Sequence, residues 1–181
     1  MRAEQVSSWQ KGTEGEDRFE AALEANAVTS QWFGWYRNTR MRMHQHDLWA
    51  LGSDLTVEQY EAKFNTHGDL DFIVIGPTGV HLIDVKNLSH ESSSAELEKM
   101  HQGMVLQRDF LAIKLRAFYD SPIRCGFVMA GHQSQWDSIG DFPVHSIKDG
   151  LKAIVEQGTP MDPRKSWELY RNAGTVLEPN R

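Results

Sequence analysis

The sequence of 181 residues contains one cysteine, Cys125, and therefore cannot form an internal disulfide bond. Cys125 lies in the apolar run 125–129, which predicts a buried structural thiol rather than a nucleophile. The longest apolar runs fall far short of the ~18 residues needed to span a membrane, and no apolar secretion signal follows Met1. We therefore expect a soluble protein of the reducing cytoplasm with no membrane partner.

An excess of positive charge is also lacking. The chain has 25 acidic residues against 19 lysines and arginines, which gives a formal net charge of -6. This balance argues against a passive nucleic-acid binder, because such proteins usually carry a broad basic surface. It does not exclude an enzyme that gathers acidic residues at a metal site and keeps only a local basic rim.

The sequence has no internal repeat, no low-complexity tract and no linker, and its length suits one domain. We expect a single domain over 1–181, with a core over about 12–147 and a helical tail over 148–181. After a polar segment over 1–13, hydrophobic periodicity predicts helices over 17–25, 56–64, 95–119, 147–157 and 163–173. Strands are predicted over 32–40, 72–75, 80–85, 122–130 and 142–147. This order predicts an α/β fold with a small mixed central sheet flanked by helices.

The most informative stretch is 68–87, where charged residues interrupt two apolar strands joined by a turn of glycine and proline. Side chains alternate along a strand, so Asp84 and Lys86 share one face. Folding back at the turn brings Asp71 within roughly one residue of direct opposition to Asp84. Two carboxylates so close repel each other unless one is protonated or a cation lies between them. Oxygen ligands of this kind suit Mg²⁺.

A third carboxylate comes from the first helix. Glu16 has the spacing to share the buried face of Phe19 and Leu23, at the expected start of that helix. Its alternative role is to stabilise the helix dipole from the first turn. Lys86 can orient or deprotonate a water molecule, or stabilise charge on a phosphate. This set suits phosphodiester hydrolysis, and a structural salt bridge between Lys86 and Asp84 is the alternative.

These motifs resemble the PD-(D/E)xK nuclease superfamily and, more closely, its NERD (nuclease-related) domain. The resemblance rests on the Gly-Glu pair at 15–16, the Gly-Asp-x-Asp and Gly-Pro-x-Gly motifs within 68–80, and the acid-x-lysine motif within 83–87. It implies a restriction-endonuclease-like core of the order αβββαβ. The catalytic residues that it implies are Glu16, Asp71, Asp84 and Lys86, with a glutamine from the helix after the hairpin. Gln102 is the better candidate for that glutamine and Gln107 is the other.

The resemblance implies a Mg²⁺- or Mn²⁺-dependent endonuclease, a hydrolase whose metal ligands are Asp71, Asp84 and Glu16 and whose substrate is DNA. A catalytically inactive NERD-type module that binds nucleic acid or a protein partner is the alternative. The intact set of four residues favours the enzyme. By analogy with nucleases of this size, a homodimer is also expected, so that two sites meet two strands.

Basic residues accompany the predicted strand over 32–40. Arg37, Arg40 and Arg42 alternate with aromatic residues, a pattern that can hold phosphates and stack bases. The alternative is an edge strand whose aromatic side chains pack inward.

Histidines lie in the segment 43–67, which resembles an insertion between two strands of the core. A third hypothesis for the chain is a histidine-rich metal-binding module that uses His44, His46 and His67. The alternative for the histidines at 44 and 46 is a solvated loop, because nothing nearby in the sequence completes a set of four ligands.

Overall fold

The computed structural model describes residues 2–27, 34–64, 70–86, 92–131 and 136–179. These residues form six helices: α1 (Arg2–Ala27), α2 (Gln45–Ala50), α3 (Val57–Phe64), α4 (Ser94–Leu115), α5 (Ile147–Glu156) and α6 (Pro163–Ala173). They also form seven strands: β1 (Gly34–Arg40), β2 (Leu70–Gly76), β3 (Gly79–Lys86), β4 (Arg124–Met129), β5 (Ser138–Ile139), β6 (Phe142–Ser146) and β7 (Glu178–Pro179). None of the helices in this described part is long and apolar enough to cross a membrane.

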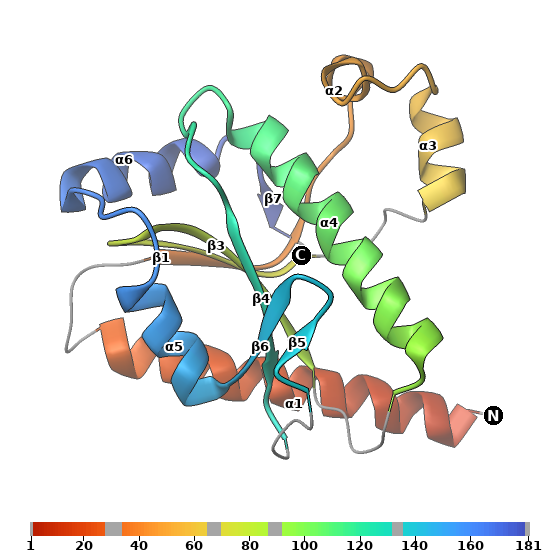
Figure 1. Cartoon of the computed structure of the whole chain (residues 1–181), viewed down its shortest axis with the longest axis vertical. Coiled ribbons are helices and arrows are strands. Elements are labelled where there is room, and N and C mark those ends of the chain that lie inside the picture. The colour runs from red at the N-terminus through yellow and green to blue at the C-terminus, as the bar shows by residue number, and fades with distance from the viewer. Residues whose placement is uncertain (1, 28–33, 65–69, 87–91, 132–135, 180–181) are drawn as a thin grey trace.

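The strands form a mixed sheet in the order β5-β6-β4-β3-β2-β1-β7. β2 pairs antiparallel with both β1 and β3, whereas β4 runs parallel to β3 and β6 runs parallel to β4. Helices cover both faces, with α1 and α5 on one side and α4 and α6 on the other (Figure 1). The order α1-β1-β2-β3-α4-β4 confirms the predicted αβββαβ core and the α/β fold class.

Strand alternation divides the core between these two layers. Ile73 and Leu82 belong to the cluster that includes α4 and α6, whereas Phe72 and Ile83 face α1 on the other side. Phe19 of α1 is fully buried and packs edge-to-face on Phe72, with 5.0 Å between the ring centroids. Burying such a ring stabilises the fold by about 1.5–3 kcal/mol. This contact fixes the rotation of α1 on the sheet.

The hairpin of β2 and β3 folds about a two-residue turn at Pro77 and Thr78, as the sequence predicts. Gly79 completes the turn with a φ of +105°, which residues with a Cβ rarely adopt. A Cβ added to Gly79 would also collide with the hydroxyl group of Tyr119. The turn therefore requires glycine at this position, and it sets the register of every pair along the hairpin.

The C-terminal segment packs on this turn. The hydroxyl of Thr78 donates a hydrogen bond to the carbonyl of Ile154 in α5 at 2.5 Å. The hydroxyl of Ser166 in α6 donates to the carbonyl of Gly76 at 3.1 Å. α6 begins at Pro163 after the N-cap Asp162, as predicted. The segment from 148 onward thus contacts the sheet on both of its faces.

The first helix begins much earlier than predicted. α1 starts at Arg2, so the segment expected to be polar and irregular over 1–13 is helical from Arg2 onward. Its polar composition and the glycines at 12 and 15 conceal the helix in the sequence. Glu16 therefore lies in the interior of α1. The first-turn dipole role for Glu16 is wrong, because the dipole acts within the first turn.

Smaller differences concern other boundaries. α4 ends at Leu115, before the predicted end at 119, and the short strand β5 lies between the predicted strands over 122–130 and 142–147, where no element was predicted. β1 is described from Gly34, and the predicted strand residues 32–33 lie outside the described part of the chain.

Between β1 and β2, the described part of the segment 43–67, residues 43–64, contains two helices. The predicted helix over 56–64 is confirmed as α3, and Thr56 caps it by accepting a hydrogen bond from N of Gln59 at 3.2 Å. The loop expected around His44 and His46 is wrong, because residues 45–50 form α2, but both histidines are exposed to solvent as expected. α2 is held in place by Asp47, which is buried and forms an ion pair with Lys114 of α4 at 2.6 Å.

Candidate active site

Asp71 and Asp84 meet where β2 begins and β3 ends. The register pairs Phe72 with Ile83, so one further step places Asp71 opposite Asp84, in agreement with the prediction. Burial, followed by the charge of Asp84 and a hydrogen bond to it, raises the pKa of Asp71 to about 9. At neutral pH Asp71 is therefore protonated and donates to Asp84, so the two carboxyl groups share one proton.

One oxygen of Asp71 is also held by the backbone. Its Oδ2 accepts a hydrogen bond from N of Val85 at 2.8 Å, across the end of the hairpin. This bond fixes the orientation of the carboxyl group relative to β3. The side chain of Asp71 is thus positioned by the hairpin itself rather than by a mobile loop.

Lys86 lies beside the two aspartates. Its Nζ forms an ion pair with Oδ1 of Asp84 at 2.7 Å, and both side chains are largely buried. Burial lowers the pKa of Lys86, but the charges of Asp84 and Asp71 outweigh it, so the pKa is raised overall. Lys86 is therefore a fixed cation, which suits stabilisation of charge better than removal of a proton.

The expected salt bridge between Lys86 and Asp84 is present, but it does not account for the whole group. One ammonium neutralises one carboxylate, and Asp71 is then left to hold a proton at a pKa far above its ordinary value. A structural ion pair gains nothing from a second buried acid. Asp71 therefore points to a role beyond support of the fold.

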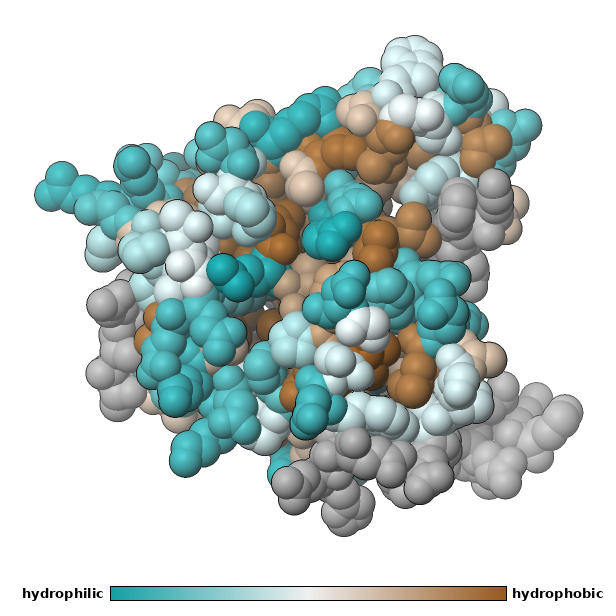
Figure 2. Space-filling view, in the orientation of Figure 1, coloured by the Kyte–Doolittle hydropathy of each residue, from teal (hydrophilic) through white to brown (hydrophobic). Residues whose placement is uncertain are grey.

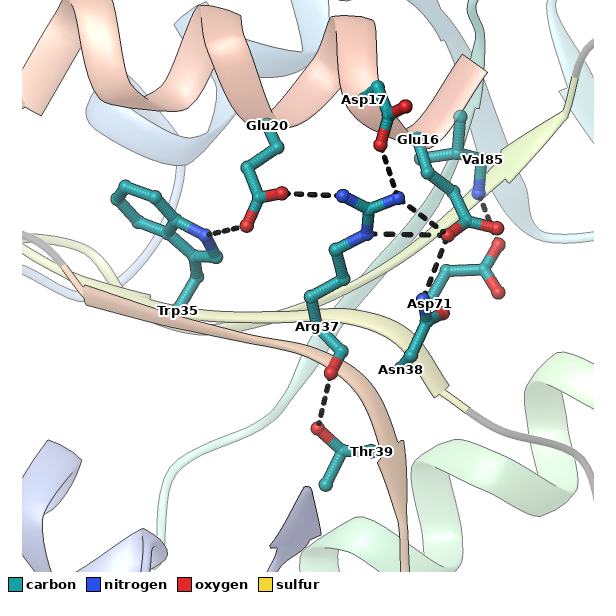
Figure 3. A network of polar contacts seen from close by, with 9 residues as sticks. All are labelled: Glu16, Asp17, Glu20, Trp35, Arg37, Asn38, Thr39, Asp71 and Val85. Carbon is teal, nitrogen blue, oxygen red and sulfur yellow. Dashed lines mark hydrogen bonds and ion pairs between the residues drawn. The ribbon is translucent and has the colours of Figure 1, made fainter. Parts of the chain in front are cut away.

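Glu16 reaches this region from the interior of α1, and residues of β1 hold it there. Its Oε2 accepts hydrogen bonds from Nε and Nη2 of Arg37 at 3.4 and 3.3 Å and from Nδ2 of Asn38 at 3.1 Å. In Figure 3 these bonds converge on one carboxylate oxygen of Glu16, and the other oxygen lies on the side of Asp71. The charge of Glu16 also acts on Lys86.

Arg37 is bound by three acids of α1 and not presented to solvent. Besides Glu16, it forms ion pairs with Asp17 at 2.6 Å and with Glu20 at 2.5 Å, and its side chain is only 21% exposed. Partial burial lowers the pKa of Arg37, but the hydrogen bonds to Asp17 and Glu20 raise it by a larger amount. The net pKa is raised, so the guanidinium stays charged. The phosphate contact proposed for Arg37 from the sequence is therefore wrong.

Asn38 adopts a backbone conformation that is uncommon for a residue with a side chain. Its φ is +47°, and asparagine is among the few residues that tolerate this region. The register between β1 and β2 continues past it, from Arg37 opposite Phe72 to Thr39 opposite Leu70. The strained residue is thus the one whose side chain contacts Glu16, and such strain often accompanies functional sites.

The carboxylates fit a divalent cation in part. Asp71 and Asp84 are paired oxygen donors that share a proton, and Mg²⁺ is commonly held by one or two carboxylates together with water and substrate phosphate. Within the described residues, however, no three His, Cys, Asp or Glu side chains lie close enough to hold a metal ion together. Glu16 is engaged by Arg37, so it does not complete the set in this arrangement.

The two candidate glutamines occupy different faces of α4. Gln102 is exposed, and its Nε2 donates to Oε1 of Glu98 at 2.7 Å; no hydrogen bond connects it to the described aspartates of the site. Gln107 is half-buried and falls on the helical stripe of Met104 and Leu111, which packs on the sheet. Position on the helix therefore favours Gln107 over Gln102.

The histidines do not form a metal site in the described part of the chain. The rings of His44 and His46 stack with 5.4 Å between centroids, and Nε2 of His46 lies 3.4 Å from Asp47. The third histidine of that hypothesis, His67, lies outside the described residues.

Arg37 and Asn38 are the site residues whose role the sequence reasoning missed. A signal for Arg37 exists: Trp35 and Arg37 alternate onto one face of β1, and the acids Glu16 and Glu20 are four residues apart on α1. Nε1 of Trp35 and Nη1 of Arg37 both donate to Glu20. Matching these two faces would have predicted the contact.

Comparison with known proteins adds one finding. The sequence model of the NERD family, the nuclease-related domain, matches residues 11–126. The matched part extends from α1 into β4 and includes Glu16, Asp71, Asp84 and Lys86. No curated protein and no solved structure matches the chain.

Proposed function

The chain belongs to the NERD family, and from this premise we propose that it is a Mg²⁺- or Mn²⁺-dependent endonuclease that hydrolyses phosphodiester bonds of DNA. The observation that carries the proposal is the apposition of Asp71 and Asp84 beside the fixed cation of Lys86. Two acids that share a proton form a site in which a divalent cation can replace that proton. Such a cation promotes phosphodiester hydrolysis, because it polarises the phosphoryl oxygen and makes bound water a better nucleophile.

Each residue has a distinct part in the proposed reaction. Asp71 and Asp84 would hold the metal ion, and Asp71 is kept in place by a hydrogen bond from N of Val85. Mg²⁺ or Mn²⁺ supplies a Lewis acid and lowers the pKa of bound water. The ammonium of Lys86 stabilises the negative charge that develops on the phosphate as water attacks, an electrostatic effect that is strong in a partly buried site.

Glu16 supports this set from α1. Arg37 and Asn38 bind one of its oxygens and leave the other on the side of Asp71 (Figure 3). The second oxygen of Glu16 would then be available to a divalent cation held by Asp71 and Asp84, or to water beside it. We assign Arg37 and Asn38 as positioning residues for Glu16.

The second candidate is a NERD-type module that binds nucleic acid or a protein without cutting. The binding module is favoured by the lack of a third carboxylate close enough to complete a metal site among the residues that the structure describes. The shared proton of Asp71 and Asp84 favours the enzyme, since a binding module has no use for a costly buried acid pair.

A cleavage assay separates the two candidates. Purified protein is incubated with circular and linear DNA in Mg²⁺, in Mn²⁺ and in EDTA. The enzyme should nick or linearise circular DNA with either cation and leave it intact in EDTA. Retention of DNA on the protein without cutting in any of these conditions would support the binding module instead.

A further inference from the structure

A basic pocket lies away from the acidic site, where α2 meets the C-terminal end of α4. Its volume is about 370 Å³, within the range of about 300–1,000 Å³ in which proteins hold small ligands. The side chains in its lining that carry a charge or an imidazole ring are Arg42, His44, His46, Asp47, Lys114 and Arg116. In the upper part of Figure 2, hydrophobic side chains show among hydrophilic ones over α2, α3 and α4.

The pocket keeps a surplus of positive charge after its internal pairing. Asp47 is the acid in the lining, and its Oδ2 accepts from Lys114 at 2.6 Å and from N of His44 at 3.1 Å. Burial raises the pKa of Asp47, but the hydrogen bond and the charge of Lys114 lower it by a larger amount. The net pKa is lowered, so Asp47 is a carboxylate. The charges of Asp47 and Lys114 therefore cancel each other.

The two arginines are not neutralised in this way. Arg116 is 52% exposed and lies 3.9 Å from an aspartate that already has a closer cation. Arg42 is exposed and forms no ion pair with any residue that the structure describes. A protein with a net charge of -6 thus places two arginines around one hollow, and their guanidinium groups match the geometry of a phosphate.

An exposed aromatic side chain projects from α2, the short helix that lines part of the pocket. Trp49 of α2 is 66% exposed, the most exposed large hydrophobic side chain in the described part of the chain. It follows His46 by three residues, so both project from the same side of the helix. Basic residues beside an exposed aromatic ring are typical of surfaces that hold a phosphate and stack a base.

We propose that this pocket binds a backbone phosphate of a nucleic-acid strand, with Arg42 and Arg116 contacting the phosphate and Trp49 stacking on a neighbouring base. The inference rests on the proposed function in taking DNA as the ligand. It assigns a second contact to the substrate, separate from the carboxylates that perform the chemistry. Trp49 of α2 lies within the segment 43–67 and helps to hold the strand, which gives this insertion a function.

Binding is measured in EDTA, so that the result does not depend on cleavage. Fluorescence anisotropy with labelled single- and double-stranded DNA compares the parent with Arg42→Gln/Arg116→Gln, across about 50–200 mM salt. These two side chains are exposed, so their loss leaves the buried pair of Asp47 and Lys114 intact. Arg164→Gln/Arg171→Gln removes two exposed arginines of α6 and serves as the matched control.

The proposal predicts that the pocket variant binds DNA about tenfold more weakly and that its slope of log affinity against log salt is shallower by about 1. The control variant should bind like the parent, and Trp49→Ala should weaken binding with an unchanged slope. Parent-like affinity and slope in the pocket variant would overturn the proposal. So would inorganic phosphate that binds the pocket in a titration while the pocket variant retains full DNA affinity, since the ligand would then be free phosphate.

The assay also separates this inference from the proposed function. If the parent binds DNA through the pocket but never cuts with Mg²⁺ or Mn²⁺, the nuclease proposal fails and the phosphate site stands. If the parent cuts DNA and the pocket variant binds it unchanged, the nuclease proposal stands and the phosphate site fails.

Discussion

Nε and Nη2 of Arg37 in β1 lie 3.4 and 3.3 Å from the same oxygen of Glu16 in α1. This contact joins the first helix to the first strand at the level of the acid pair of the hairpin. It makes Arg37 part of the site without making it a ligand for DNA.

Arg37→Met should slow Mg²⁺-dependent cleavage by about 10–100-fold, the usual effect of losing a residue that orients a metal-site group. The physical reason is that Glu16 loses the partner that fixes one of its oxygens. Initial rates across a Mg²⁺ titration test it, and the Mg²⁺ concentration needed for half-maximal rate should rise. Arg37→Lys should recover part of the rate, whereas Arg164→Met on α6 should change nothing. An unchanged Mg²⁺ requirement in Arg37→Met would show a merely structural role.

Asp71→Asn should stabilise the metal-free protein at alkaline pH. In the unfolded chain Asp71 loses its proton near its ordinary pKa of 3.8, but in the folded protein it keeps it up to about 9. The folded state binds more protons in this window, so parent stability declines as the pH rises from 3.8 toward 9. Asparagine mimics the protonated acid and removes the decline.

Urea unfolding in EDTA at about pH 5 and about pH 9 measures this effect. The difference in unfolding free energy between the two pH values should be smaller in Asp71→Asn than in the parent. Asp141→Asn, at a side chain that is 96% exposed, provides the control. If the unfolding free energy changed equally between the two pH values in the parent and in Asp71→Asn, this result would contradict the raised pKa of Asp71.

His81 should make the protein sensitive to acid. Burial, followed by the charge of Arg124, lowers the pKa of His81 from 6.5 to about 4, and its Nε2 is hydrogen-bonded to Oγ1 of Thr78 at 2.8 Å. Between pH 6.5 and about 4, His81 is therefore protonated in the unfolded chain but neutral in the folded protein. Stability is lost as the pH falls through this range. The loss approaches about 1.4 kcal/mol per pH unit for one proton. In His81→Gln, which retains a donor for Thr78, denaturant unfolding should show a smaller loss; a loss as steep as in the parent would exclude His81 as its source.

The buried pair of Asp47 and Lys114 should be strongly coupled. Lys114→Met leaves the carboxylate of Asp47 buried without its main partner, and such a change costs about 3–5 kcal/mol of unfolding free energy. The double variant Asp47→Asn/Lys114→Met should cost less than the sum of the two single variants, because no charge is left unpaired. Urea denaturation of the parent, of the two single variants and of the double variant completes this double-mutant cycle. Additive effects would mean that the pair does not anchor α2.

Sequence reasoning succeeded where the interactions are local. The hairpin register follows from the turn at Pro77 and Thr78, and strand alternation then brings Asp71, Asp84 and Lys86 together. Four helices after the first were also predicted, although α4 ends earlier than expected. In all these elements the pattern that determines the structure lies within a few neighbouring residues.

It failed where distant segments meet. The contact of Arg37 with Glu16 depends on how α1 is rotated on the sheet, which the packing of Phe19 on Phe72 decides. Likewise, the pairing of Asp47 with Lys114 joins an insertion to a helix far along the chain. Hydrophobic periodicity carries no information about such pairs, so the role of Arg37 was misread.

The account as a whole depends on the pair of Asp71 and Asp84 beside Lys86, and Mg²⁺-dependent cleavage of DNA by Asp84→Asn tests it most directly. Asparagine keeps the size of the side chain but removes the negative charge that pairs with Lys86 and can bind the metal. The account predicts a rate lower by about 100-fold or more in a folded protein, while Asp141→Asn cuts like the parent. A cleavage rate in Asp84→Asn equal to that of the parent would contradict it.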